Sequence, residues 1–208
     1  MQMKNETAIP PLIEMVGSGG DIKQEQTIRA VITRFKERAV PHLITALNSS
    51  NDDNRSGGFA EILGKIGDET SIPTLQEILT KETSEEYTRL QSIYALQEIS
   101  TVASYKALIV YLESAPEEEK EAIKEACLSK KLITFPILIE LLTHAEISEE
   151  YYIEIGDILA QVQAPTYDKL FTKLEDKGLV KKLASILKEH TPEEEEFLPL
   201  HEVLDQYI

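Results

Sequence analysis

Residue types that could do chemistry are scattered in this sequence. The four histidines form neither a two-histidine helical pair nor a zinc-binding spacing. They are His42, His144, His190 and His201. Cys127 falls on an apolar helical stripe, where packing is more typical than nucleophilic catalysis. Residues 17–20, Gly-Ser-Gly-Gly, lack the Lys-Ser/Thr of a phosphate-binding loop and predict a turn between helices. We therefore expect no catalytic residue, no metal site and no cofactor, and predict that the protein is not an enzyme.

Acidic residues, in contrast, are regularly spaced. Pairs of carboxylates recur about every 32 residues, each at a turn that leads into a helix. The pairs are Asp52 and Asp53, Glu85 and Glu86, Glu117 and Glu118, and Glu149 and Glu150. Stacked repeats place equivalent turns along one edge, so the pairs predict a negative edge that steers a basic protein partner.

Helix capping explains the same residues without a partner. Acids in a first helical turn stabilise the free N–H groups and the helix dipole. Ser84, Ser148 and Thr191 stand where N-cap residues are expected. The two interpretations are compatible, and the sequence leaves both open.

A second set of candidate binding residues belongs to the expected concave face. Counting from the apolar stripes, the acidic and amide positions that point outward are Glu61, Gln91, Glu98, Glu154 and Asp157. With the neighbouring lysines and arginines, this surface is mixed in charge and poor in aromatics. It fits neither a platform for stacking bases nor an apolar peptide groove. Three tyrosines near the acidic pairs could anchor a partner or pack partly in the core. They are Tyr87, Tyr151 and Tyr152.

The charge balance restricts the class of partner. The 208 residues include 37 acidic and 21 basic ones, for a net charge of −16. Nucleic acids and anionic membranes are bound through basic patches, so we expect neither as a partner. No apolar run approaches the ~18 residues of a membrane span. The N-terminus has no apolar signal region, and one cysteine excludes an internal disulfide, so we expect a cytoplasmic protein.

A leucine that returns every 30 to 33 residues defines the elements that position these residues. Each copy opens a helical pattern and is followed four residues later by another apolar residue. The copies are Leu12, Leu43, Leu75, Leu108, Leu138 and Leu170. A fixed period of this length is typical of stacked helical hairpins. No segment alternates as a strand does. We predict an all-α fold, an α–α superhelix in the form of a right-handed solenoid.

The second repeat shows the pattern most clearly. Residues 41–47 predict its first helix, residues 48–54 a polar turn, and Gly67 the end of its second helix. In the third repeat, Leu90, Ile93, Tyr94 and Leu96 predict the apolar stripe. We expect one domain, residues 1–208, of about six hairpins and a C-terminal capping helix. The repeats are 10–39, 40–71, 72–104, 105–134, 135–166 and 167–190, and the cap is 191–208.

Three segments resemble a HEAT repeat. They are AVPHLITAL at 39–47, AEILGKIGD at 60–68 and SIPTL at 71–75. The pattern is most similar to the short HEAT-like repeats of the phycobilisome-lyase type. It covers the second repeat and the start of the third, and reduces to an apolar skeleton over the rest of 10–190. Gly57 and Gly58 depart from it, because the family usually has alanine or arginine there. The resemblance implies a solenoid whose second helices line the concave side and which mostly holds other proteins.

These observations predict a non-catalytic scaffold or adaptor. A rigid, acidic solenoid surface would be presented to a basic protein, and we expect the chain to be a monomer. The repeat subtype implies an alternative, a bilin lyase or lyase-like chaperone acting on a tetrapyrrole-carrying protein. A DNA glycosylase built on HEAT-like repeats would need a basic groove, which the charge balance disfavours.

Overall fold

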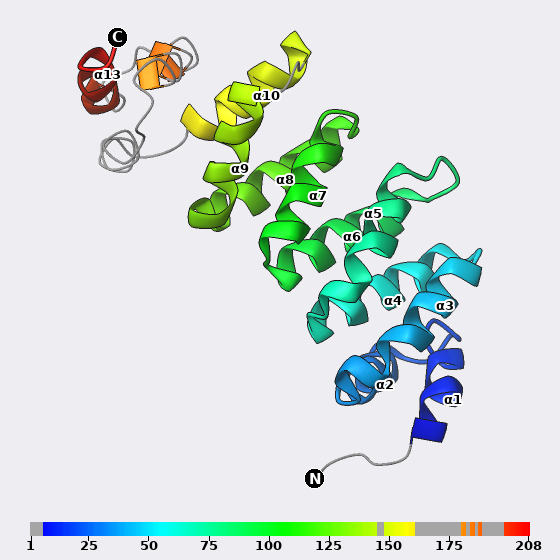
Figure 1. Cartoon of the computed structure of the whole chain (residues 1–208). Coiled ribbons are helices and arrows are strands. Elements are labelled where there is room, and N and C mark those ends of the chain that lie inside the picture. Colours follow the sequence, from blue (N-terminus) through cyan, green and yellow to red (C-terminus); the bar gives the residue numbers. More distant parts are fainter. Residues whose placement is uncertain (1–5, 145–147, 161–179, 182–183, 186, 189–197) are drawn as a thin grey trace. The chain divides into compact units, whose positions relative to one another are not determined.

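The computed structural model describes residues 6–144, 148–160, 180–181, 184–185, 187–188 and 198–208. Within these ranges the chain forms helices and turns and contains no strand (Figure 1), so the predicted all-α class is confirmed. Two compact units, residues 1–126 and residues 127–208, are described separately below. The predicted single domain and the repeat boundaries stay predictions. Among the described helices, none has the length and hydropathy that a membrane span needs.

The first unit is a series of helical hairpins. Their helices are α1 (Ile9–Glu14) and α2 (Ile22–Thr33), α3 (Val40–Ser49) and α4 (Asp53–Ile66), α5 (Ile72–Thr80) and α6 (Glu86–Ile99), and α7 (Val102–Leu112) and α8 (Glu117–Ser129). Short 3-10 turns, η1 (Glu6–Ala8), η2 (Lys36–Arg38) and η3 (Glu69–Ser71), precede α1, α3 and α5. The last residues of α8 belong to the second unit.

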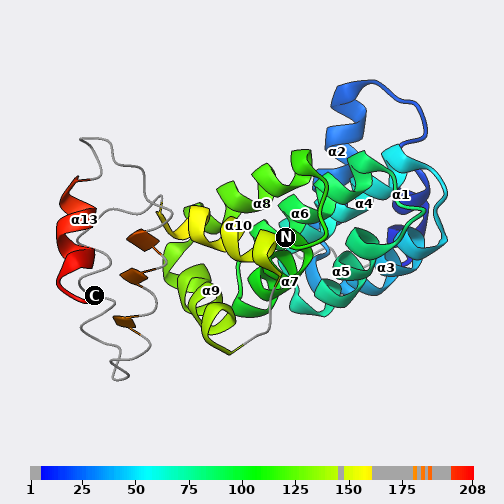
Figure 2. The ribbon, with the colours of Figure 1, turned by 90° about the horizontal axis from the view of Figure 1, so that it is seen from above.

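The hairpins of the first unit form two layers. Helices α2, α4 and α6 pack on one another in order, while α1 packs on α3 and α5 on α7. Within the hairpins, α3 contacts α4 and α5 contacts α6. Figure 2 shows α4, α6 and α8 in one row and α3, α5 and α7 in the other. The second helices of successive repeats therefore lie side by side, as the sequence period predicts.

Four of the periodic leucines are core residues, whereas Leu12 is half-buried. Leu43, Leu75 and Leu108 are fully buried, and Leu138 is buried in the second unit. Each such side chain contributes roughly 1.5–3 kcal/mol through removal of apolar surface from water. Leu170 lies outside the described residues. The leucine period is thus a packing period.

Local signals set the ends of these helices. Pro41 and Pro73 lie in the first turns of α3 and α5, where a missing N–H breaks no helical bond. Gly67 ends α4 in the left-handed conformation, with φ of 74°, and its N–H donates to the Leu63 carbonyl. Gly17 and Gly19 also have positive φ in the turn between α1 and α2. The predicted turn at residues 17–20 and helix end at Gly67 are both confirmed.

A glycine brings α4 and α6 unusually close together. A Cβ atom built on Gly64 would lie 2.5 Å from the Cα and 2.9 Å from the Cβ of Ala95. The backbone of Ala95 cannot move away as a flexible side chain can. Gly64 and Ala95 therefore fix both the separation and the register of these two helices.

The second unit begins within α8 and continues through α9 (Lys131–His144) and α10 (Glu149–Ala160), which pack on each other. The predicted N-cap Ser148 is confirmed, because its hydroxyl accepts the N–H of Tyr151 at 3.2 Å. The last helix, α13 (Leu198–Asp205), is tied to Lys188 by an ion pair from Asp205. The expected cap at Thr191 and most of the sixth repeat lie outside the described residues.

We expect Gly64→Ala to lower the free energy of unfolding by about 1–3 kcal/mol, because the new methyl group forces α4 and α6 apart. Gly57→Ala is the matched control in the same helix. Its methyl group would meet the movable ring of Tyr87, and alanine favours helix by roughly 1 kcal/mol over glycine. Urea unfolding followed by circular dichroism measures both. Equal stabilities for the two variants would show that the α4–α6 interface relaxes freely.

Candidate functional site

The first turns of α4, α6 and α8 meet at one edge of the first unit. Asp53, at the start of α4, accepts hydrogen bonds from Thr88 in the first turn of α6. Arg89 of α6 donates through Nε to the Glu119 carboxylate of α8 at 2.7 Å. Each bond joins the beginnings of two successive second helices. Three of the four predicted acidic pairs therefore lie along one edge, which we call the acidic edge (Asp52, Asp53, Glu85, Glu86, Glu117 and Glu118).

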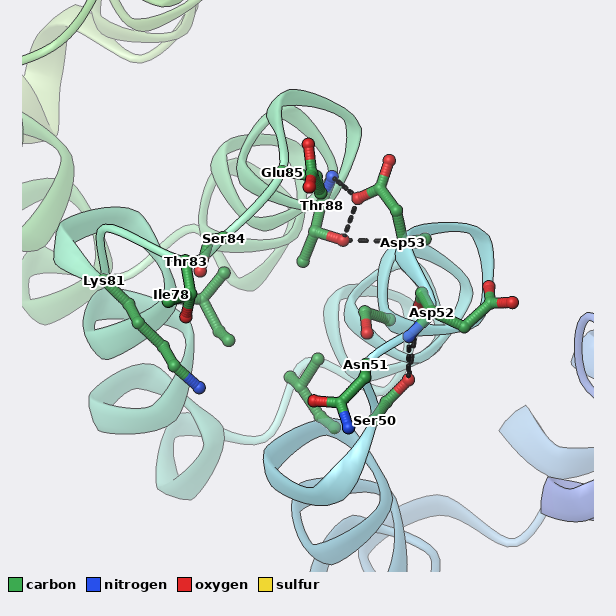
Figure 3. A pocket seen from close by; sticks show the side chains of 12 residues that line it. Ser50, Asn51, Asp52, Asp53, Ile78, Lys81, Thr83, Ser84, Glu85 and Thr88 are labelled. Atoms are coloured by element: carbon green, nitrogen blue, oxygen red, sulfur yellow. Dashed lines mark hydrogen bonds between the residues drawn. The ribbon is translucent and has the colours of Figure 1, made fainter.

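The two aspartates of the acidic edge cap two different helices. Asp52 is the N-cap of α4, and its carboxylate accepts the N–H of Arg55 at 2.9 Å. The Asp53 carboxylate reaches across to α6, where it accepts the Thr88 N–H at 3.0 Å and the Thr88 hydroxyl (Figure 3). Thr88 is 3% exposed, so these bonds are shielded from water. Ser84 is not the N-cap of α6, contrary to expectation. Glu85 takes that backbone position without a side-chain cap, and Asp53 bonds the free N–H instead.

The glutamates of the acidic edge point to solvent. Glu85, Glu86 and Glu118 are exposed, and within the described part of the chain no ion pair reaches their carboxylates. Glu117 is 72% exposed and lies 3.6 Å from the Lys120 amine. The aspartates thus stabilise helix starts, while three of the glutamates leave their charge available to another molecule.

A buried polar cluster lies beneath this edge and had not been predicted. Glu119 is 1% exposed and accepts from the Arg89 guanidinium and, at 2.6 Å, from the Tyr111 hydroxyl. Arg89 also donates to the Ser84 carbonyl, which holds the turn before α6. Burial raises the pKa of Tyr111 above its ordinary value, and the hydrogen bond and charge of Glu119 raise it further. The cluster ties the third repeat to the fourth.

A hollow of about 220 Å³ lies between the turns that precede α4 and α6. Asp52, Asp53 and Glu85 contribute to its wall, together with Leu47 and Ile78 from the first helices. Lys81 and Asn51 extend from the two facing turns (Figure 3). The hollow is therefore a polar recess of mixed charge within the acidic edge.

The predicted concave residues differ in how far internal contacts occupy them. Glu61 bonds both Arg29 of α2 and Lys65 of α4. Although burial alone would raise the pKa of Glu61, the hydrogen bonds from Lys65 and Arg29 lower it below its ordinary value. Gln91 is half-buried, and Glu98 is exposed. Glu61 therefore has little charge left to offer a partner.

The remaining predicted residues belong to the second unit. Glu150 is exposed in the first turn of α10, and Glu154 and Asp157 are half-buried on the same helix. Glu149 begins α10, and its side chain lies outside the described part. These four acids share one helix and are considered apart from the acidic edge.

The described side chains do not gather into a recognisable catalytic group. Within the described ranges, no cluster of three or more histidines, cysteines or acids could hold a metal ion. Cys127 is fully buried, and burial raises the pKa of its thiol to about 12. A thiol with this pKa is almost entirely protonated at neutral pH and is a poor nucleophile. His190 lies outside the described residues.

Comparison with a family model agrees with the helical repeats of part of the chain. A family model described as HEAT repeats matches residues 40–127, which run from α3 into α8. Over these residues the sequence is similar to HEAT repeats. A solved structure, the complex of CpcE and CpcF of phycocyanin lyase from Nostoc sp. PCC7120, is similar over 96% of this chain and 94% of that chain, with 18% identity and a TM-score of 0.47. That likeness says nothing about what this chain binds. No curated protein matches the sequence.

The contacts missed from the sequence share a simple signal. Arg29 and Glu61 lie 32 residues apart, and Arg89 and Glu119 lie 30 apart. Each pair has opposite charges on consecutive second helices, separated by one repeat length. Charge pairs at the repeat period could therefore have been sought alongside the leucines.

We expect Asp53→Ala to lower the free energy of unfolding by about 1–2 kcal/mol, because Thr88 loses its bonds to the carboxylate in a shielded place. Glu85→Ala is the control, since that side chain caps nothing, and its effect should stay within about 0.5 kcal/mol. Urea denaturation of both variants makes the comparison. A larger loss for Glu85→Ala would mean that Asp53 is not the cap of α6.

Tyr111→Phe should cost about 1–3 kcal/mol at neutral pH, because it leaves a buried Glu119 oxygen without its donor. The folded-state pKa of Tyr111 is raised, so its contribution is complete below the unfolded value of about 10 and declines as the pH rises above it. The stability difference between wild type and variant should therefore shrink between about pH 8 and about pH 11. Urea unfolding of both proteins at the two pH values measures this difference in the free energy of unfolding. A difference that does not change with pH would contradict the raised pKa of Tyr111.

Proposed function

We propose that this chain is a non-catalytic scaffold that holds a basic protein along the acidic edge, as a monomer in the cytoplasm. The observation that carries the proposal is the division among the edge residues. Asp52 and Asp53 have hydrogen-bonding partners within the fold, whereas Glu85, Glu86 and Glu118 have no ion pair within the described residues. Side-chain caps account for the aspartates. Glu86 and Glu118 lie in the first turns of α6 and α8, where they favour the helix dipole, but their exposed carboxylates bond to no described residue.

Electrostatics gives the edge a physical role. Carboxylates arranged in successive repeats act together on an approaching cation, and the net charge of −16 adds to their field. Such steering raises the association rate more than it deepens the final affinity. It also weakens with salt, because the screening length falls from about 10 Å at 0.1 M to about 3 Å at 1 M. A stack of rigid repeats suits this role because it keeps the charges in place.

The proposal is tested by removing two charges from the acidic edge in one variant and two charges from another surface in a second variant. Glu85→Gln with Glu118→Gln removes two charges from the acidic edge without breaking a described bond. Glu37→Gln with Glu77→Gln removes two exposed charges elsewhere in the first unit. Each purified protein is immobilised, exposed to native lysate at low salt and eluted with a salt gradient into mass spectrometry.

We expect wild type and the Glu37/Glu77 control to release the same basic protein at the same salt concentration. The Glu85/Glu118 variant should release it at clearly lower salt, or fail to retain it. Identical elution from all three proteins would refute the role of the acidic edge. A pigment-carrying protein in the eluate would instead favour the bilin lyase alternative.

A further inference from the structure

Helix α6 presents one face that other described residues cover only in part. Tyr87, Gln91, Tyr94 and Glu98 follow one another at spacings of four, three and four, so they lie on one side of the helix. Tyr87 is 38% exposed and Tyr94 is 46% exposed. The opposite side of α6, with Ser92, Ile93, Ala95, Leu96 and Ile99, is buried. We call the four outward residues the tyrosine stripe.

Tyr94 corrects the sequence-based prediction, which placed it on the apolar stripe of this helix. Within the described chain, neither the Tyr87 nor the Tyr94 hydroxyl has a hydrogen-bond partner. The two Cα atoms are separated by roughly 10 Å along the helix axis, at about 1.5 Å per residue. Large, amphipathic and rigid side chains at this exposure are typical of the anchors of protein interfaces.

Gly57 makes room for the first of these rings. A Cβ atom on Gly57 would lie 2.4 Å from Cε1 and 2.7 Å from Cδ1 of Tyr87, and 3.2 Å from Cγ of Gln91. The Tyr87 ring therefore rests against the bare backbone of α4. Any larger residue at position 57 would push the ring away, so Gly57 is a positioning residue for Tyr87.

Charge selects the kind of molecule that fits the stripe. Glu98 is the last residue of the stripe, is exposed and has no ion pair to the described residues. Glu86 directly precedes Tyr87 and therefore lies about 100° around the helix from the stripe. Across the layer, the charges of Glu25 and Glu61 are already balanced by Arg29 and Lys65. Two aromatic rings followed on the same face by an available carboxylate suit a planar cation with an apolar stem.

We infer that the tyrosine stripe is the docking site for an arginine-bearing helix of the basic partner. This inference rests on the proposed function and adds to it the chemistry of the contact. An arginine guanidinium stacks on an aromatic ring and donates to a carboxylate at the same time, which a compact lysine ammonium does less well. Two arginines seven residues apart on one helix would match the spacing of Tyr87 and Tyr94.

The test uses the full chain and three alanine-based helical peptides. Each peptide carries two residues seven positions apart, which are arginine, lysine or the neutral isostere citrulline. We expect the arginine peptide to bind most tightly and to shift the ring NMR signals of Tyr87 and Tyr94 among the eight tyrosines. Equal binding of the citrulline peptide, or no binding of the arginine peptide, would overturn the inference.

Variants distinguish the contribution of the tyrosine rings to binding from that of hydrophobic surface in general. Tyr94→Leu should weaken the arginine peptide about threefold to fivefold, whereas Tyr94→Phe keeps the ring and most of the affinity. Gly57→Ala should weaken it by displacing Tyr87, with the fold intact by circular dichroism. Val110→Ala, an exposed apolar residue on α7, is the control and should leave binding unchanged. Wild-type affinity in Tyr94→Leu would show that the ring takes no part.

The two proposals can fail separately. If the peptides do not bind but the Glu85/Glu118 variant still loses its partner, the scaffold stands and the tyrosine stripe is wrong. If the arginine peptide binds at the stripe while the acidic edge has no effect on partner elution, the edge is wrong and the stripe stands. Glu98→Gln, which alters only the stripe, should weaken the arginine peptide and leave the citrulline peptide unaffected.

Discussion

The close approach of α4 and α6 at Gly64 is the constraint on which the rest of this structure depends. With no side chain at position 64, the α4 backbone comes against Ala95, and that contact fixes how far one repeat can slide along the next. Because the register is fixed there, the first turns of α4 and α6 arrive at the same level at the other end of the helices. Asp53 can then reach Thr88, and the carboxylates of consecutive repeats line up.

Neighbouring acids at this edge have different structural roles. The role of each acid depends on which groups of its own helix or of the adjacent repeat lie next to it. An acid that meets a free N–H of a helix becomes a cap, as Asp52 and Asp53 do. Glu119, in the first turn of α8, is buried and requires both Arg89 and Tyr111 to satisfy its oxygens. Those that meet nothing keep their hydration and their charge. Sequence spacing alone does not distinguish the capping, the buried and the exposed acids.

Much of the fold could be predicted because its determinants are local or periodic. The leucine period, the prolines at helix starts and the left-handed Gly67 each act within one repeat. Asp53 could not be identified as the cap of α6, because its partner lies 35 residues away. Ser84 looked like the better local candidate for the same reason. The exposure of Tyr94 was missed because an aromatic residue at a helical spacing is typical of a buried core position. Only the packing of α4 shows which side of α6 is covered.

Capping across repeats also changes how the chain should unfold. In a stack held only by apolar contacts, one hairpin can open while its neighbour persists, since each interface adds its own increment of stability. Here the start of α6 depends on a side chain of α4, so fraying of the earlier helix removes the cap of the later one. Thermal opening should therefore spread from one hairpin to the next, and the α4–α6 pair should exchange its amide protons as one cooperative block.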